Sequence, residues 1–191
     1  MLQDHFFLNE DPNELSHDDF LFFKELIFKL AGLSFSNKKK DLVYSRLRPY
    51  LYKNNLGSFE EYRHLLLKSS HNHSEKQNLI NILTTNKTDF FREYEHFRYL
   101  EETLIPYWIK NNKKDISIWC CASSSGEEPY SLALVLNKYL PTSIKFQLLA
   151  TDINTHVLST AKNGVYPLSA IMDIPQKYHT NAIKFGTKTT N

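Results

Sequence analysis

Cysteine and long apolar runs are both scarce in this chain of 191 residues. The two cysteines, Cys120 and Cys121, are neighbours on a predicted strand, so their side chains point to opposite faces. An ordinary disulfide between them is implausible, and a reducing, cytoplasmic compartment fits best. No apolar run reaches the length of a membrane span, and the first residues are acidic rather than signal-like. We therefore expect no membrane insertion.

An excess of charge of one sign is also missing, because the formal net charge is only +2. The net charge therefore indicates neither nucleic acid nor a membrane surface as a partner. The sequence shows no Ser-His-Asp set, and its one H-x-H pair, His71 and His73, has no acid or cysteine at ligand spacing. Structural metal sites need about four ligands, so we expect no metal. The hydrophobic content of 41% still supports a globular protein with a core.

The N-terminal part is predicted to be helical. Residues 1–15 lack periodicity and are expected to form a flexible tail. Ser16 is a helix N-cap candidate with acids in the first turn after it, and Gly32 stands where that helix should stop. A basic helix follows from about Asn37, and Pro49 should kink or end it. Two further helices begin at sequences with capping-box spacing, at Ser58 and Ser74.

The C-terminal part alternates between helical and strand patterns. The polar run from Thr84 to Asp89 predicts a break, after which Phe90–Glu93 should resume a helix that kinks at Pro106. A short apolar strand at 115–121 leads through a small-residue turn into a helix that begins at Glu127. A second strand at 145–151 ends on Asp152 and is followed by a helix at 155–162. A strand, a turn, a helix and a strand in this order predict a Rossmann-type sheet.

The turn after the first strand contains a single glycine, Gly126, which argues against a glycine-rich dinucleotide loop. The helix then opens with Glu127 and Glu128, which would repel a pyrophosphate but suit a ligand that carries an ammonium or sulfonium charge. Asp152 follows Gly126 by 26 positions, near the spacing of about 20 for an acid that binds ribose hydroxyls. S-adenosylmethionine fits this pattern, whereas NAD and ATP fit badly. A structural alternative stays open, because acids are ordinary partners of a helix N-terminus.

Three blocks of sequence identify a family. They are KKKDLVYSRL at 38–47, LTTNKTDFFRE at 83–93, and the pair SSSGEEPYS at 123–131 and LLATDIN at 148–154. With these blocks in this order, the sequence resembles the CheR family of chemotaxis methyltransferases, which use S-adenosylmethionine to methylate glutamates of chemoreceptors. The resemblance covers residues from about 18 to the last residue given.

The resemblance implies roles for individual residues of the transfer site. Asn86, Thr88 and Arg92 match family residues that line the cofactor and methyl-transfer site. Arg92 is the catalytic candidate, since it could hold the cofactor carboxylate or the incoming glutamate by paired hydrogen bonds. Glu127 matches the acid near the methionyl part, with Glu128 as a substitute, and Asp152 matches the acid that serves the nucleoside.

The resemblance also implies a receptor-binding surface. Lys39, Lys40 and Arg46 match family positions that contact the glutamate-rich cytoplasmic helices of a chemoreceptor, although Pro49 and Tyr52 stand where family members usually add arginines. The assigned chemistry needs no general base, because a glutamate side chain is already a carboxylate at neutral pH. Methyl transfer then depends mainly on the alignment of the reacting atoms.

We therefore predict an α + α/β chain. An all-helical domain at 16–84 is followed by a connecting loop and helix at 85–112. The first part of a Rossmann-like, S-adenosylmethionine-dependent methyltransferase domain occupies 113–191. The family's domain continues beyond two strands, and two parallel strands cannot easily bury both faces. We expect another copy or chain to complete the sheet, or the chain to be a truncated enzyme, or its C-terminal half to be loosely folded. The alternative function is a non-catalytic module that binds a receptor or S-adenosylmethionine.

Overall fold

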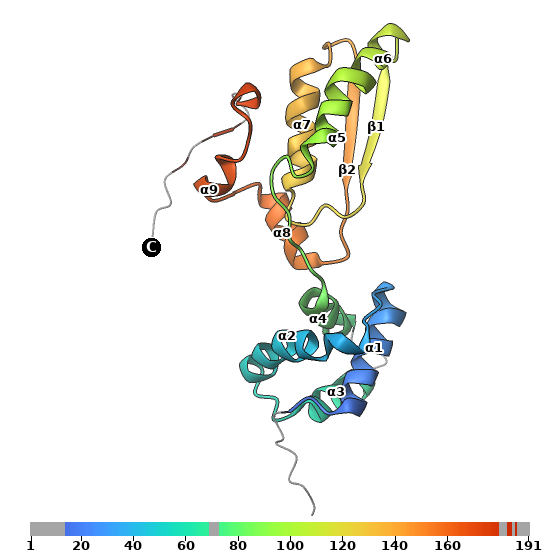
Figure 1. The fold of residues 1–191 in the computed structure, drawn as a ribbon, viewed down its shortest axis with the longest axis vertical. Helices are drawn as coiled ribbons and strands as arrows, with labels where there is room; N and C mark the ends of the chain where they lie inside the picture. Colours follow the sequence, from blue (N-terminus) through green and yellow to red (C-terminus); the bar gives the residue numbers. More distant parts are fainter. Residues whose placement is uncertain (1–13, 69–72, 180–182, 185, 187–191) are drawn as a thin grey trace, which may run out of the picture. The chain divides into compact units, whose positions relative to one another are not determined.

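A computed structural model describes residues 14–68, 73–179, 183, 184 and 186 of the chain. The chain divides into two compact units, Met1–Thr84 and Thr85–Asn191 (Figure 1). Each unit has a hydrophobic core of its own. Within the described residues, no helix combines the length and the apolar character that a membrane crossing requires.

The first unit is built from helices. They are α1 (His17–Ala31), the 3-10 turn η1 (Asn37–Lys39), α2 (Lys40–Lys53), α3 (Phe59–Lys68) and α4 (His73–Leu83). Both predicted ends of α1 are confirmed: the Ser16 hydroxyl accepts a hydrogen bond from the Asp19 amide at 3.0 Å, and Gly32 has a left-handed φ of 68°. The helices bury one side each in a shared core that includes Phe23, Leu47 and Tyr62. Leu15 is also buried in this core, so the predicted tail is too long at its end, while residues 1–13 lie outside the described residues.

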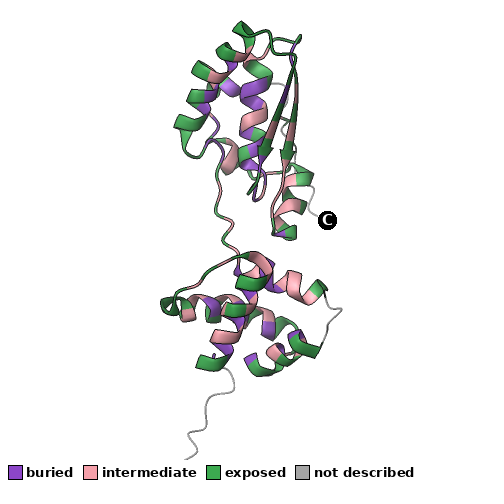
Figure 2. Cartoon of the chain, turned by 90° about the vertical axis from the view of Figure 1, so that its right-hand side faces the viewer, coloured by how far each residue is buried: buried purple, intermediate pink, exposed green. Residues whose placement is uncertain are grey.

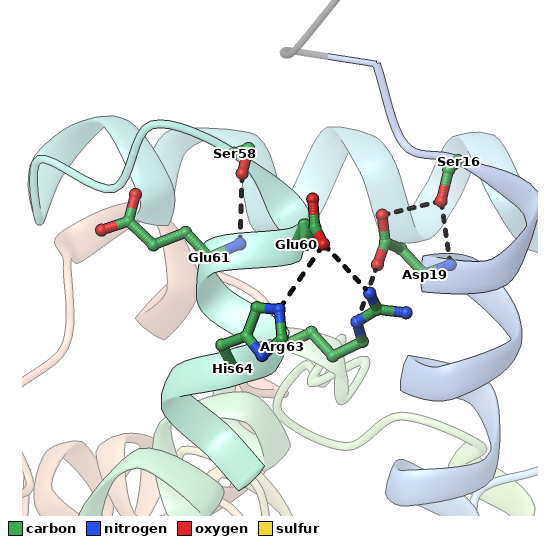
Figure 3. Close-up of polar contacts among 7 residues, drawn as sticks. All are labelled: Ser16, Asp19, Ser58, Glu60, Glu61, Arg63 and His64. Carbon is green, nitrogen blue, oxygen red and sulfur yellow. Dashed lines mark hydrogen bonds and ion pairs between the residues drawn. The ribbon is translucent and has the colours of Figure 1, made fainter. Parts of the chain in front are cut away.

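Polar contacts join α1 to α3 (Figure 3). The Arg63 guanidinium lies 3.3 Å from the buried Asp19 carboxylate and 3.6 Å from Glu60. The predicted cap at Ser58 is confirmed, since its hydroxyl accepts a hydrogen bond from the Glu61 amide at 3.1 Å. These contacts link the N-terminal part of α1 to the N-terminal part of α3, although the two helices are far apart in the sequence.

Pro49 was expected to kink or end the second helix, and of these two outcomes the end is wrong. Proline lacks the amide hydrogen that would bond to the preceding turn, yet α2 continues through Pro49 to Lys53. The apolar residues Val43, Leu47 and Leu51 are buried on both sides of Pro49, which is itself exposed. Burial of this continuous apolar stripe offsets the loss of one backbone hydrogen bond.

The second unit contains a small parallel sheet and several helices. In chain order the elements are α5 (Tyr94–Tyr99), the π-helix η2 (Leu100–Leu104), α6 (Ile105–Lys110), β1 (Asp115–Cys120), α7 (Glu127–Tyr139), β2 (Lys145–Ala150), α8 (Thr155–Asn163), α9 (Leu168–Ile171) and the 3-10 turn η3 (Gln176–Tyr178). β1 and β2 pair in parallel, with Ile116 opposite Phe146 and Cys120 opposite Ala150. The predicted strand, turn, helix and strand are therefore present in the predicted order.

Residues 90–93 do not form the predicted start of a helix. They form a turn, and α5 begins only at Tyr94. Phe91 and Glu93 have left-handed backbone angles, with φ of 54° and 56°. Such angles interrupt a right-handed helix and are rare for bulky side chains. The turn therefore needs support from the surrounding structure.

One face of the β1–β2 sheet is covered and the other is exposed. α5, η2, α6 and α7 contribute Phe97, Leu100, Ile105 and Val135 to a core against which Ile118 and Phe146 of the strands pack. Figure 2 shows buried stretches of helix beside the two strands. Residues 85–112 thus help to form this core. On the opposite face, the paired side chains of Trp119 and Leu149 are 68% and 60% exposed. The alternation along both strands separates a buried face from a face in solvent.

Candidate ligand site at the carboxyl ends of β1 and β2

Hydrogen bonds continue beyond the ends of the two strands and bring their connecting loops together. The Thr151 amide donates to the Cys120 carbonyl at 2.9 Å, and the Ser123 amide donates to the Thr151 carbonyl at 3.0 Å. The loop from Ser123 to Gly126 therefore lies beside Asp152, at the edge of the sheet where ligands of parallel α/β proteins bind.

Asp152 is a junction between the two loops. Its Oδ2 accepts a hydrogen bond from the Ser124 amide at 2.8 Å, and its Oδ1 accepts one from the Asn154 amide at 2.8 Å. A carboxylate offers about four acceptor positions, so each oxygen retains capacity for a ligand hydroxyl. Asp152 can thus shape the loop and bind a diol at the same time.

The two acids at the start of α7 have different environments. The Glu127 side chain is buried, with 9% exposed, and its Oε2 accepts a hydrogen bond from the Ser125 hydroxyl at 2.7 Å. Glu128 is exposed, and its Oε1 lies 3.5 Å from the Cys120 sulfur. Burial and the nearby Glu128 carboxylate raise the pKa of Cys120 to about 12. Glu127 is therefore the acid whose carboxylate contacts the loop, through Ser125, whereas the Glu128 carboxylate lies beside Cys120.

Gly126 is required by backbone geometry and by close packing. Its φ is 104°, and a Cβ atom there would lie 2.5 Å from the Tyr166 hydroxyl oxygen and 2.9 Å from the Ala161 Cβ. The Tyr166 hydroxyl donates a hydrogen bond to the Ser125 carbonyl at 2.6 Å. Burial, together with the nearby Glu127 carboxylate, raises the pKa of Tyr166. Tyr166, which follows α8, thus packs against the loop and fixes its backbone at Ser125.

The segment 86–92 is attached to this loop. The Ser124 hydroxyl donates to the Asn86 carbonyl at 2.9 Å, and the Arg92 Nη1 donates to the Lys87 carbonyl at 2.7 Å. Asn86 and Thr88 are half-buried, whereas Arg92 is exposed. Phe91 and Ser124 both have positive φ values. Strained backbone of this kind is concentrated at binding and catalytic sites.

The residues present fit a nucleoside ligand that carries a positive charge. Ser123 is 1% exposed, and its hydroxyl has no hydrogen-bond partner among the described residues. Buried hydroxyls are rarely left without a partner, which favours a ligand atom at this position. The buried carboxylate of Glu127 is chemically suited to an ammonium group, and the remaining acceptor positions of Asp152 are suited to hydroxyl donors. A pyrophosphate would meet two acids instead of a free helix N-terminus.

The sequence-predicted site residues are divided between the two units. Asn86, Thr88, Arg92, Glu127 and Asp152 belong to the second unit and lie on two connected loops and the first turn of α7.

The predicted receptor contacts belong to the first unit. Lys39 is exposed and Lys40 is half-buried, both at the start of α2. Arg46 Nη1 donates to the carbonyls of Leu83 and Thr84, at 2.6 Å and 3.1 Å, and so binds the end of α4.

No group of three or more possible metal ligands occurs among the described residues, and His71 lies outside them.

Three residues that build the site were not singled out from the sequence. Ser124 and Tyr166 fix the loop through the hydrogen bonds described above. Ser131 is completely buried on α7 and bonds to the amide of Phe91 at 3.0 Å. The available signal was a serine directly before the apolar run 132–136 of this helix, where a buried polar group needs a specific partner.

A parallel β-α-β unit with acids at the helix start and at the end of the second strand belongs to the class of Rossmann-type nucleoside-binding domains. The family model described as "CheR methyltransferase, SAM binding domain", where SAM is S-adenosylmethionine, matches residues 86–189. The model "CheR methyltransferase, all-alpha domain" matches residues 18–84. The chain therefore belongs to the CheR methyltransferase family, and the predicted family and fold class are confirmed.

The curated relatives are named chemotaxis protein methyltransferases. The chain is 40% identical over 161 residues to chemotaxis protein methyltransferase 2 of Pseudomonas aeruginosa, covering 84% of the chain and 56% of the relative. It is 36% identical over 159 residues to the chemotaxis protein methyltransferase of Borreliella burgdorferi, covering 80% and 56%. The Escherichia coli chemotaxis protein methyltransferase is 38% identical over 153 residues, covering 80% and 51%. The chain thus spans about half the length of these relatives.

Proposed function

We propose that the second unit binds S-adenosylmethionine at the carboxyl ends of β1 and β2. We further propose that the chain acts in the methylation of chemoreceptor glutamates. The observation that carries this proposal is the buried Glu127 carboxylate at the first turn of α7, beside a loop that Asp152 anchors. Glu127 would receive the ammonium group of the methionyl part. Asp152 would accept hydrogen bonds from the ribose hydroxyls.

The remaining residues of the site would orient the reactants. S-adenosylmethionine would supply a methyl group activated by the sulfonium charge. Arg92 would hold a carboxylate by paired hydrogen bonds, while Asn86 and Thr88 would line the space beside it. Because the accepting glutamate is already ionised at neutral pH, the chain needs no proton acceptor. Its contribution would be alignment and exclusion of water.

The receptor would contact the start of α2. Lys38, Lys39 and Lys40 lie at a helix N-terminus, where the helix dipole disfavours cations. Retaining three lysines at such a position is easier to explain if an acidic partner binds there. We propose Lys39 and Lys40 as the primary contacts with the cytoplasmic helices of a chemoreceptor. Arg46 would fix α4 against α2 at the end of the same basic surface, and the reaction would take place in the cytoplasm.

The cofactor site can be tested by calorimetric titration with S-adenosylhomocysteine. Glu127→Gln removes the charge of the buried acid and should weaken binding at least about tenfold, the cost of losing a charge-assisted hydrogen bond. Glu128→Gln is the matched control, because it makes the same change at an exposed neighbour, and it should bind within about twofold of the unsubstituted chain.

A second ligand separates the two acids. 5′-Methylthioadenosine has the nucleoside but not the amino-acid part, so Glu127→Gln should leave its affinity unchanged. Asp152→Asn should weaken both ligands, because it alters the acid assigned to the ribose. The assignment would be wrong if Glu127→Gln weakened both ligands equally, or if Glu128→Gln had the larger effect.

A non-catalytic receptor-binding module is the second candidate function. One observation favours it: one face of its sheet is exposed at Trp119 and Leu149. A second copy could cover that face, which sedimentation would detect as a concentration-dependent mass. Receptor binding without incorporation of labelled methyl groups would support this candidate, whereas methyl incorporation would eliminate it.

A further inference from the structure

Ser131 connects two parts of the proposed cofactor site that lie far apart in the sequence. It lies on α7, one turn after Glu127, and its side chain is 0% exposed. Its hydroxyl donates a hydrogen bond to the Glu127 carbonyl at 2.7 Å and accepts one from the Phe91 amide at 3.0 Å. One hydroxyl therefore joins the first turn of α7 to the segment 86–92.

The bond to Phe91 supports a backbone conformation that the chain does not adopt readily. Phe91 has a φ of 54°, which is uncommon for a bulky residue, and it is buried. A buried amide without a partner is strongly unfavourable. Ser131 provides that partner, so the left-handed turn at Phe91 depends directly on α7.

Other contacts hold the same segment from different sides. The Ser124 hydroxyl bonds to the Asn86 carbonyl at 2.9 Å at the start of the segment. The Phe91 ring stacks on Tyr178, with ring centroids 4.6 Å apart and planes at 16°. Ser131 differs from these contacts because it bonds to the turn that carries Glu127 as well as to Phe91, which precedes Arg92.

We propose that Ser131 is a positioning residue, which fixes the segment bearing Asn86, Thr88 and Arg92 relative to Glu127. This inference rests on the proposed function, because it assigns the two parts to one ligand site. Loss of the hydroxyl frees the turn at Phe91 and separates groups that must act together on one ligand. A small displacement of positioned groups has a large effect on binding and transfer.

The test compares Ser131→Ala with Ser131→Thr, which keeps a hydroxyl able to bond to the carbonyl one turn earlier. Ser159→Ala is the matched control, because it makes the same change at an exposed position of α8. For each variant, the affinity for S-adenosylhomocysteine is measured by calorimetry. The hydrogen-exchange rate of the Phe91 amide is measured by NMR without ligand. If Ser131→Ala does not fold, Ser131→Cys, which replaces the hydroxyl by a somewhat larger thiol that bonds weakly, replaces it.

We expect Ser131→Ala to weaken S-adenosylhomocysteine binding about tenfold and to accelerate exchange at Phe91. Ser131→Thr should restore both properties, and Ser159→Ala should change neither. Unchanged affinity in Ser131→Ala, or no recovery in Ser131→Thr, would overturn the inference. If the unsubstituted chain bound no S-adenosylhomocysteine, the proposed function would fail. Exchange at Phe91 would then decide separately whether Ser131 holds the segment.

Discussion

At the scale of single residues, neighbouring side chains of identical type have opposite environments. Cys120 is buried and Cys121 is exposed, and Glu127 is buried whereas Glu128 is exposed. The first difference follows from the alternation of side chains along a strand. The second follows from helix geometry, because neighbouring residues of α7 point in different directions and only one of them faces the rest of the unit. Chemical type alone therefore does not identify which of two neighbours can act.

The two thiols should react at very different rates. Burial and the nearby Glu128 carboxylate raise the pKa of Cys120 to about 12, so at pH 7 this thiol is protonated and shielded. We expect iodoacetamide to modify Cys121 alone in the folded chain and both cysteines in urea, as measured by peptide mass spectrometry. Cys121→Ser should abolish the reaction of the folded chain. Equal labelling of Cys120 and Cys121 without urea would contradict the buried position of Cys120.

The sequence predicted that Cys120 and Cys121 point to opposite faces, but not that Cys121 is exposed, and it left the choice between Glu127 and Glu128 open. The period of a strand assigns alternate residues to opposite faces, whatever packs on it. The face that a residue occupies at the start of α7 depends on how the helix packs, which a local pattern does not contain. The roles of Ser124 and Ser131 were missed for the same reason, because their partners Asn86 and Phe91 are 38 and 40 residues away.

At the scale of elements, the turn η3 is attached to the π-helix η2 by a cluster of polar and aromatic groups. The Glu101 Oε2 accepts hydrogen bonds from Lys177 Nζ at 2.7 Å and from the Tyr178 hydroxyl at 2.6 Å. Burial opposes ionisation of Glu101, but the hydrogen bonds from Lys177, Tyr139 and Tyr178 outweigh it and lower its pKa to about 2. The same cluster supports the ring of Tyr178 on which Phe91 stacks.

This cluster should make stability depend on pH. The ordinary pKa of the group is 4.5, and in the folded chain it is about 2. Its contribution is therefore complete above about pH 4.5 and is lost as the pH falls towards 2. Glu101→Gln should reduce the free energy of unfolding by about 1.5 kcal/mol at pH 7, and the difference should shrink as the pH falls below 4.5.

Urea unfolding of Glu101→Gln and of the exposed neighbour Glu102→Gln, measured at several pH values, provides the comparison. Glu102→Gln should behave like the unsubstituted chain. A difference between Glu101→Gln and the unsubstituted chain that stayed constant between pH 7 and pH 3 would rule out the ionised Glu101 as its source.

The helix ends at Ser16, Gly32 and Ser58 were predictable, whereas turns imposed by distant contacts were not. The cap predicted at Ser74 is wrong, because α4 begins at His73. Ser16, Gly32 and Ser58 act as the sequence predicts, because capping is a local interaction. The local pattern of residues 90–93 predicts a helix, since nothing in it indicates the positive φ of Phe91. That angle is supported by Ser131 and by the stacked Tyr178. Pro49 does not end α2, because the residues on both sides of it bury one continuous apolar stripe.

At the scale of the whole molecule, each unit has its own core, and the proposed roles divide between them. The first unit carries the lysines proposed to contact the receptor. The second carries the groups proposed to bind the cofactor. The composition and motifs sufficed to predict an all-helical part followed by a Rossmann-like part. They could not predict that residues 85–112 contribute Phe97, Leu100 and Ile105 to the core of the second unit.

The central claim is that this chain binds S-adenosylmethionine and not a dinucleotide. Calorimetric titration of the chain with S-adenosylhomocysteine, followed by titration with NADH under the same conditions, tests it most directly. We predict saturable binding of one S-adenosylhomocysteine per chain and no heat of binding for NADH, because a pyrophosphate would face Glu127 and Glu128. Saturable NADH binding, or no S-adenosylhomocysteine binding at millimolar concentration, would contradict the account.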